Sequence, residues 1–505
     1  MAKWIYLWVG LASGYATVCA TEKIKIKYRA DQLEGVEKGE ATYKRLIGNV
    51  VFVHEDVTFK ADYAQYYDEQ HRLEAHDNIV VTAEDGSTIT AKRLLYDTER
   101  KIARLDEEVV YQADTMACYT DQLYYAADEK RIYFFEGAKV IEGDHVLTST
   151  AGYYEGNQHL AVFYNQVAVN STEYTVQCDT LRYNTTDKTA QFQGPTCITH
   201  RSGDTLRTDA GGKYNTRTQM GAFRHASLET PDYWLTTDLL DADQKKEIYT
   251  ATGNVKLVSK KHASTIVSDY GQYMQKKNEV LVYGRPLMQR VIDGDTLYLA
   301  ADTLVMQEEA LPNQDADAVV FAFGNVQMYK SDLQGKADSM TYYHRDSTVH
   351  FHPNPIFWSY DNQITADTIR LVLQDEALHK MYMDRNAFLS AQDTLGHFNQ
   401  LKGNHMVANF QANTIASIDI EGNGESLYFF VDDSARLVGM NHLRCGRIHL
   451  EIHKNKPSKI SFFTQPVGIF YPAHKMEATH QELPAFAWRM AERPTLQEIL
   501  ARNRE

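Results

Sequence analysis

The sequence predicts an all-β protein built from about twelve repeats of roughly 30 residues each. The first observation is the repeat itself, a short signature that recurs between residues 31 and 367. The second is an alternation of apolar residues at a spacing of two, as in Val319, Phe321 and Phe323, which is typical of strands. The third is the abundance of tyrosine, 32 of 505 residues, which favours strands over helices.

The repeat signature is a small residue followed in most copies by Asp, as in Cys178 and Asp179. The aspartates of this row are Asp31, Asp62, Asp121, Asp179, Asp209, Asp238, Asp269, Asp302, Asp338 and Asp367. Lys92 and Ala151 take the same position in the two remaining copies. We interpret the row as structural, with each Asp bonded to nearby backbone so that it fixes a bend. A catalytic carboxylate has no reason to recur in every repeat, and single aspartates do not supply the several oxygen ligands of a calcium site.

A second signature, Gly-Asn before an apolar residue, lies between the Asp copies at residues 48–50, 253–255 and 324–326. Gly and Asn suit the backbone of a bend or a bulge. Each strand is therefore predicted to run along one wall, bend near its middle and continue in a second wall. Stacked strands of this kind form two facing sheets joined along one edge, around a continuous apolar interior.

Residues 1–20 are predicted to be a secretory signal peptide, with an uncleaved N-terminal anchor as the alternative. Lys3 precedes an almost wholly apolar stretch from Trp4 to Val18, and Val18 and Ala20 are suitable residues before a cut at Thr21. An oxidising compartment permits disulfides in any of three complete connectivities, and the alternative is four small buried thiols. The cysteines concerned are Cys118, Cys178, Cys197 and Cys445.

The formal net charge of −15 argues against a nucleic-acid partner, because binding to nucleic acid depends on basic side chains that neutralise phosphates. No P-loop, dinucleotide-binding or Gly-x-Ser-x-Gly motif occurs. His350 and His352 share a strand face, but no third metal ligand accompanies them. The sequence therefore predicts no enzyme, no cofactor and no metal site.

The beginning of the predicted mature chain resembles the OstA-like domain of LptA and of the N-terminal part of LptD. The segments 24–26, 30–32, 46–53 and 57–63 carry the resemblance, with the Ala-Asp and Gly-Asn-Val motifs of that family. The motifs recur over residues 24–385. The resemblance implies an elongated V-shaped β-jellyroll, or β-taco, whose groove holds the acyl chains of lipopolysaccharide. It also implies a periplasmic location at the outer membrane, and jellyroll partners in the inner- and outer-membrane transport complexes.

The C-terminal part resembles the long OstA-like proteins of Bacteroidota through residues 400–404, 422–429 and 439–441, together with Cys445. We assign residues 21–385 to the repeats and residues 386–505 to a C-terminal β-rich module. Residues 494–503 are predicted to form a short helix, because Leu496, Ile499 and Leu500 share one face. This helix would cap a sheet edge or dock a partner.

Alternate apolar residues of the strands are the candidates for the lining of a lipid groove. They are Ile24, Ile26, Val50, Phe52, Phe59, Ile132, Phe134, Val255, Leu257, Phe321 and Phe323. The same alternation is typical of a closed β-sandwich core, so the spacing does not identify the open face. A continuous apolar lining shelters a lipid without covalent chemistry, since each buried CH₂ contributes about 0.8 kcal/mol.

The sequence thus predicts a non-enzymatic periplasmic carrier or bridge for lipopolysaccharide, which serves outer-membrane assembly. Strand edges at both ends of such a fold invite docking with similar jellyrolls or end-to-end self-association. The alternatives are an outer-membrane β-barrel, a β-helical enzyme acting on polysaccharide, and a structural repeat protein. The chain ends in Glu505 rather than in the aromatic residue typical of the barrel class, and it lacks the clustered acids or bases of the enzyme class.

Overall fold

The computed structural model describes residues 26–38, 41–260, 263–292, 294–309, 317–375, 377–411, 414–432, 434–453 and 456–502. The predicted signal peptide and the groove candidate Ile24 lie outside these residues. The chain divides into two compact units, Met1–Asn165 and Gln166–Glu505, and each is described by itself.

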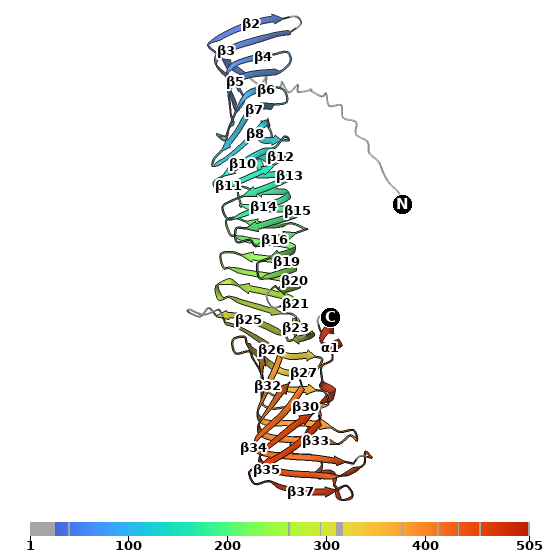
Figure 1. Ribbon diagram of the computed structural model, residues 1–505. Coiled ribbons are helices and arrows are strands. Elements are labelled where there is room, and N and C mark those ends of the chain that lie inside the picture. The colour runs from blue at the N-terminus through green and yellow to red at the C-terminus, as the bar shows by residue number, and fades with distance from the viewer. Residues whose placement is uncertain are drawn as a thin grey trace, which may run out of the picture. The chain divides into compact units, whose positions relative to one another are not determined.

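The first unit is made of short and medium antiparallel strands (Figure 1). They are β1 (Lys27–Arg29), β2 (Gln32–Lys38), β3 (Ala41–His54), β4 (Val57–Tyr67), β5 (Arg72–Thr82), β6 (Thr88–Asp97), β7 (Ile102–Ala113), β8 (Met116–Ala126), β9 (Arg131–Phe134), β10 (Ala138–Glu142), β11 (His145–Ser149) and β12 (Ala151–Glu155), with the 3₁₀ turn η1 (Gly156–Gln158). Strand β13 (Leu160–Asn170) leads into the second unit.

The second unit continues the pattern and ends in short helical turns and one helix, α1 (Leu496–Ala501). Its strands are β14 (Tyr174–Asn184), β15 (Thr189–His200), β16 (Thr205–Thr208), β17 (Gly212–Asn215), β18 (Met220–Glu229), β19 (Tyr233–Asp243), β20 (Ile248–Ser259), β21 (Ser264–Met274), β22 (Glu279–Tyr283), β23 (Leu287–Ile292), β24 (Asp295–Ala300), β25 (Thr303–Glu309), β26 (Asp317–Lys330), β27 (Leu333–Tyr343), β28 (Thr348–His352), β29 (Ile356–Ser359), β30 (Asn362–Thr365), β31 (Thr368–Gln374), β32 (Ala377–Gln392), β33 (Phe398–Gln411), β34 (Thr414–Val431), β35 (Leu437–His453), β36 (Lys456–Phe463) and β37 (Val467–Pro472). The 3₁₀ turns are η2 (Gln275–Lys277), η3 (Ala473–Lys475), η4 (Ala478–His480) and η5 (Met490–Glu492).

The strands pair antiparallel, mostly with the strands directly before and after them in the chain. In several places one long strand pairs with two short ones, as where residues 339–343 of β27 pair with β28 and residues 334–336 pair with β29. A long strand thus belongs to two walls, one on each side of its bend. The predicted all-β jellyroll class is confirmed, and antiparallel ladders are incompatible with a parallel β-helix.

The long strands bend at a bulge of two residues. In β3, Gly48 and Asn49 both have a left-handed backbone, with φ of 75° and 42°, and together they face Asp62 of β4. Similar bulges lie at residues 77–78, 107–108, 253–254, 324–325, 385–386 and 422–423. The buried positions shift by one residue across the bend, so the inner face stays apolar in both walls. We call this bend the crease.

The Asp row joins neighbouring strands at the crease. At five of the bulges, the Asn at the second position donates a hydrogen bond to an Asp carboxylate, whereas the sequence predicts a bond to the backbone. These pairs are Asn49–Asp31, Asn78–Asp62, Asn254–Asp238, Asn325–Asp302 and Asn386–Asp367, at 2.6–3.1 Å. Gly suits the first bulge position because a Cβ at Gly253, where φ is 78°, would lie 2.6 Å from Oδ2 of Asp238.

The residue before each Asp is small because it faces the narrow inside of the crease. Thr208, Ser268 and Ala301 are all buried there. The Thr237 hydroxyl lies 3.0 Å from the carbonyl oxygen of Thr252, to which it donates. The signature therefore combines an inward residue that fills little space with an Asp that faces outward.

The copy at Lys92 keeps this geometry with the charges exchanged. The facing bulge consists of Glu107 and Glu108, whose φ angles are 66° and 52°. Lys92 pairs with Glu108, and Arg93 pairs with Glu107. In this copy, an ion pair between Lys92 and a carboxylate thus takes the place of the Asn–Asp hydrogen bond.

The end of the chain returns along the outer face of the second unit's sheet, where α1 lies close to β26 (Figure 1). A row of side chains in register across β27, β29, β30, β32 and β33 includes the buried glutamines Gln334, Gln363 and Gln400. Their bonds to the returning segment are Arg493 Nε to Gln334 Oε1 (2.7 Å), Gln363 Nε2 to Ala487 O (2.7 Å), Gln400 Nε2 to Gln481 O (2.9 Å) and Leu483 N to Gln400 Oε1 (2.8 Å). We call residues 478–502 the strap.

The predicted terminal helix is present and docks on its own sheet. Ile499 of α1 is fully buried against Leu287 and Ala300. The predicted boundary between residues 385 and 386 falls inside β32, at one of the creases. The hydrophobic core continues past this point, from Ile266 to Leu450.

Candidate functional site

A row of apolar side chains crosses the inner face of one wall in the second unit. Ladder pairing places each member directly opposite the next: Val176, Ile198, Leu206, Leu228, Leu235, Leu257, Ile266, Met288, Leu299 and Met328. Several of its members belong to the hydrophobic core of this unit, which identifies the face as the inner one. At about 4.8 Å per strand, nine steps make an apolar path of roughly 43 Å. We call it the apolar row.

The other wall contributes a second inner row, in which residue size changes along the unit. Its members are Leu181, Phe192, Gly212, Phe223, Leu240, Ala251, Gly271, Val282, Leu304, Ala322, Met340 and Phe351. Gly and Ala occupy three of the positions between β17 and β21. Larger residues such as Leu304, Met340 and Phe351 predominate afterwards.

The burial of the apolar row also changes along the unit. Five consecutive members of the apolar row, from Ile198 to Leu257, are only half-buried, whereas Leu299 and Met328 are buried. A hydrocarbon chain lying on the half-buried part would remove additional apolar surface from water. The half-buried part of the row is therefore the most suitable place in this wall for an apolar ligand.

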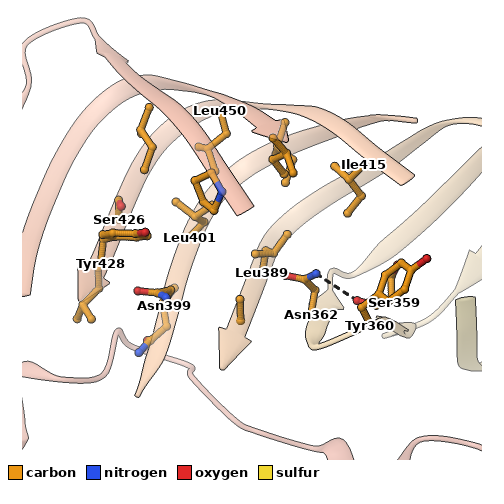
Figure 2. A pocket seen from close by; sticks show the side chains of 17 residues that line it. Ser359, Tyr360, Asn362, Leu389, Asn399, Leu401, Ile415, Ser426, Tyr428 and Leu450 are labelled. Carbon is orange, nitrogen blue, oxygen red and sulfur yellow. Dashed lines mark hydrogen bonds between the residues drawn. The ribbon is translucent and has the colours of Figure 1, made fainter. Parts of the chain in front are cut away.

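A cavity of about 80 Å³ lies farther along the same unit. Figure 2 shows Leu389, Leu401 and Leu450 among its lining side chains, together with the polar groups of Asn362 and Tyr428. The Asn362 amide donates to the Ser359 carbonyl oxygen at 3.1 Å. An apolar lining with a few polar groups is typical of small-molecule sites.

The interior of the first unit is closed by contacts between its two walls. The Phe52 and Tyr66 rings lie 5.3 Å apart, and the Phe59 and Tyr96 rings lie 4.5 Å apart. His54 Nδ1 lies 2.7 Å from the Tyr96 hydroxyl. Burial raises the pKa of Tyr66 to about 12 and lowers the pKa of His54. These shifts agree with an interior from which water is largely excluded.

The structure distributes the predicted groove residues over three environments. Buried in the first unit are Val50, Phe52, Phe59, Ile132 and Phe134, while Ile26 precedes β1 and is half-buried. Val255 is buried and Leu257 half-buried in the second unit.

Phe321 and Phe323 do not line the interior. Their rings stack on each other at 6.0 Å, and Phe323 is 46% exposed, whereas Ala322 between them is fully buried. Ala322 is therefore the inner residue of this strand. Apolar residues occupy both faces of β26, so a spacing of two does not identify the inner one.

The predicted groove residues do not include Ile198, Leu206, Leu228 and Leu235, although the sequence contains a signal for such positions. Inner-row residues lie three positions before the Asp of a repeat, as Leu235 does before Asp238, or three positions after its Asn, as Leu257 does after Asn254. The same offsets locate Phe59 and Phe52 in the first unit. The crease signature thus defines the inner row once the side of the bend is known.

The described residues contain no group of three or more His, Cys, Asp or Glu side chains placed to hold a metal ion. His350 is packed against the ring of Tyr343, at 5.3 Å, and burial lowers its pKa. The thiols of Cys118, Cys178, Cys197 and Cys445 are free. Within the same residues, no helix is long and apolar enough to cross a membrane.

The strands and inner rows define a class of protein, a β-jellyroll of two creased walls around an apolar interior. Two protein-family models match the chain within this architecture. Residues 21–179 match the OstA-like protein family, and residues 235–377 match the family of LptA and the LptD N-terminal domain, described as LPS transport proteins. These two matches confirm the resemblance to the OstA-like and LptA families that the repeated motifs carry. No curated protein matches it significantly.

Proposed function

We propose that this protein is a non-enzymatic periplasmic carrier that shelters the acyl chains of lipopolysaccharide during outer-membrane assembly. The observation that carries the proposal is the apolar row, whose consecutive half-buried members Ile198 to Leu257 offer similar aliphatic side chains at equal spacing. The family matches favour the same substrate, because one of the matched families consists of LPS transport proteins.

Equal spacing of similar side chains suits transport better than storage. Each CH₂ that leaves water contributes about 0.8 kcal/mol wherever it lies on the row, so neighbouring positions bind with similar affinity and no position is a deep trap. A formal net charge of −15 does not attract an anionic head group, and recognition therefore rests on the acyl chains.

We further propose that other jellyroll proteins of the transport system dock at the end of the second unit. Strand β37 pairs with β35, and its side chains Val467, Ile469 and Phe470 are 68%, 53% and 50% exposed. Among the described residues β37 pairs only with β35, and an apolar strand at the edge of a sheet suits the addition of a strand from a partner. A second copy of this chain is the alternative occupant.

Site-specific photo-crosslinking in cells tests the carrier function. Probes at Leu206 and Leu257 should capture lipopolysaccharide, because both side chains are half-buried members of the apolar row. Probes at their neighbours Arg207 and Lys256, which are exposed on the opposite face, serve as matched controls. Equal capture at all four positions, or capture at none, would contradict the proposal.

A further inference from the structure

Two ion pairs join opposite edges of the first unit. Strand β3 runs from its crease to a turn at residues 55–56, whereas β6 runs from its crease to a turn at residues 98–101 on the other wall. Lys101 Nζ nevertheless lies 2.8 Å from Oε2 of Glu55. One repeat later, Lys130 Nζ lies 2.7 Å from Oε2 of Glu84 in the same arrangement. We call these two pairs the latch.

The latch covers a cavity of about 190 Å³. Tyr96, Tyr111, Tyr125 and Ile132 line the cavity, and all four latch residues border it. The tyrosines and Ile132 are buried, whereas the latch side chains of Glu55, Glu84 and Lys130 are well exposed. Buried rings thus lie beneath a layer of charges, and the carboxylates of Asp56, Asp85 and Asp128 also border the cavity.

The two ion pairs of the latch can separate at a small cost in free energy. Ion pairs between exposed side chains contribute little to stability and are screened by salt. Asp128 offers Lys101 a second carboxylate at 2.9 Å on its own wall, so the Lys101 ammonium keeps a partner when Glu55 moves away. The walls can therefore part without leaving this ammonium unpaired.

We propose that the latch holds the interior of the first unit shut, and that the cavity beneath it receives a lipid acyl chain when the two ion pairs part. The proposal rests on the carrier function proposed above and adds a controlled point of access to it. The second unit offers its half-buried row at all times, whereas the first unit exposes its interior only when the latch opens.

Thiol labelling measures the opening without any lipid. Cys118 is buried and lies directly opposite Tyr111, which lines the cavity. In the double variant Glu55→Gln/Glu84→Gln, a maleimide should label Cys118 several-fold faster than in the wild type. Raising the salt from about 0.1 M to about 1 M should accelerate labelling of the wild type in the same direction, because the Debye length falls from roughly 10 Å to roughly 3 Å.

The matched control is Glu107→Gln/Glu108→Gln, which removes two carboxylates from the outside of a crease in the same unit. It should leave the Cys118 labelling rate unchanged, and labelling of Cys445 provides an internal reference in each sample. Equal Cys118 rates in the wild type and both variants, with no dependence on salt, would overturn the latch.

A photo-crosslinking arm with purified lipopolysaccharide separates this proposal from the carrier function. With the latch removed, a probe at Tyr111 should capture several-fold more lipid than in the wild type, while a probe at Leu257 captures lipid in both. Capture at Leu257 with none at Tyr111 would overturn the assignment of the cavity and leave the carrier function standing. Absence of capture at both positions would overturn the carrier function, and the labelling rates of Cys118 would then decide the latch alone.

Discussion

The first unit and the middle of the second unit use the same crease and the same inner positions, but they fill those positions differently. In the first unit the positions hold rings such as Phe52, Phe59 and Tyr111, and all three are buried. In the second unit they hold Leu206 and Leu228, which remain half-buried. Rings reach across to the opposite wall, whereas aliphatic side chains leave part of the interior open. The size of the inner side chain thus decides whether the interior of the jellyroll is filled or partly open.

The difference has an energetic consequence. Each buried aromatic side chain removes about 150–250 Å² of surface from water, so the closed unit gains most of its stability from its interior. The open stretch leaves apolar surface in water, at about 25 cal/mol for each Å², and a bound acyl chain would recover this free energy. We therefore expect the first unit to be stable without lipid and the second unit to be stabilised by lipid.

The largest predicted effect tests the comparison directly. Phe52→Ala should lower the free energy of unfolding by about 3–5 kcal/mol, because the substitution empties a fully packed site. Leu228→Ala should cost only about 1–2 kcal/mol, because this side chain is half-buried and its neighbours can relax. Urea unfolding followed by hydrogen exchange in each unit measures both values. Similar losses at the two positions would show that the units are equally closed.

The next largest loss of stability is expected at the strap, which covers the outer face of the sheet rather than its interior. Gln400→Ala should weaken the unit by about 2–4 kcal/mol, since the Leu483 N–H and the Gln481 carbonyl both lose their partner. The exposed Gln411 on the same strand is the control, and Gln411→Ala should have little effect. Hydrogen exchange of residues 478–492 should become faster in the first variant alone. Unchanged exchange would mean that the strap is held by its apolar contacts.

The repeat could be predicted from the sequence because it is local, since Asp, Gly and Asn act within a few residues of the crease they build. The choice between open and closed stretches could not be predicted, because it depends on which residues of different strands lie opposite each other. Leu206 and Leu228 are ordinary alternating residues until the ladder places them side by side. The strap could not be predicted either. Its partners Gln334, Gln363 and Gln400 are far apart in the sequence and look like surface residues.

We expect the crease to contribute equally to stability in both units. Gly→Ala substitutions at the crease test this expectation. Gly48→Ala and Gly253→Ala should each cost about 2–4 kcal/mol, because a Cβ at either position meets Oδ2 of an Asp at 2.6 Å and the backbone is left-handed. Gly294 has nearly the same φ, 77°, with open space around it, so Gly294→Ala should cost only about 1–2 kcal/mol. Thermal unfolding of the three variants measures the difference. If Gly294→Ala lost as much stability as Gly253→Ala, the backbone conformation alone would explain the loss and the Asp contact would contribute nothing.

The smallest predicted effect concerns the crease with exchanged charges. Lys92→Asp places a third carboxylate beside Glu107 and Glu108 and should destabilise the first unit by about 1 kcal/mol, with part of the loss recovered in high salt. Changing the bulge as well, in Lys92→Asp/Glu107→Gly/Glu108→Asn, rebuilds the arrangement of Asp238 with Gly253 and Asn254 in outline and should restore most of the stability. Urea unfolding at low and high salt measures all three proteins. If the triple variant stays as unstable as the single one, the ion pairs at this crease contribute more than an Asp–Asn bond provides. The crease at Lys92 would then differ from the others in strength as well as in charge.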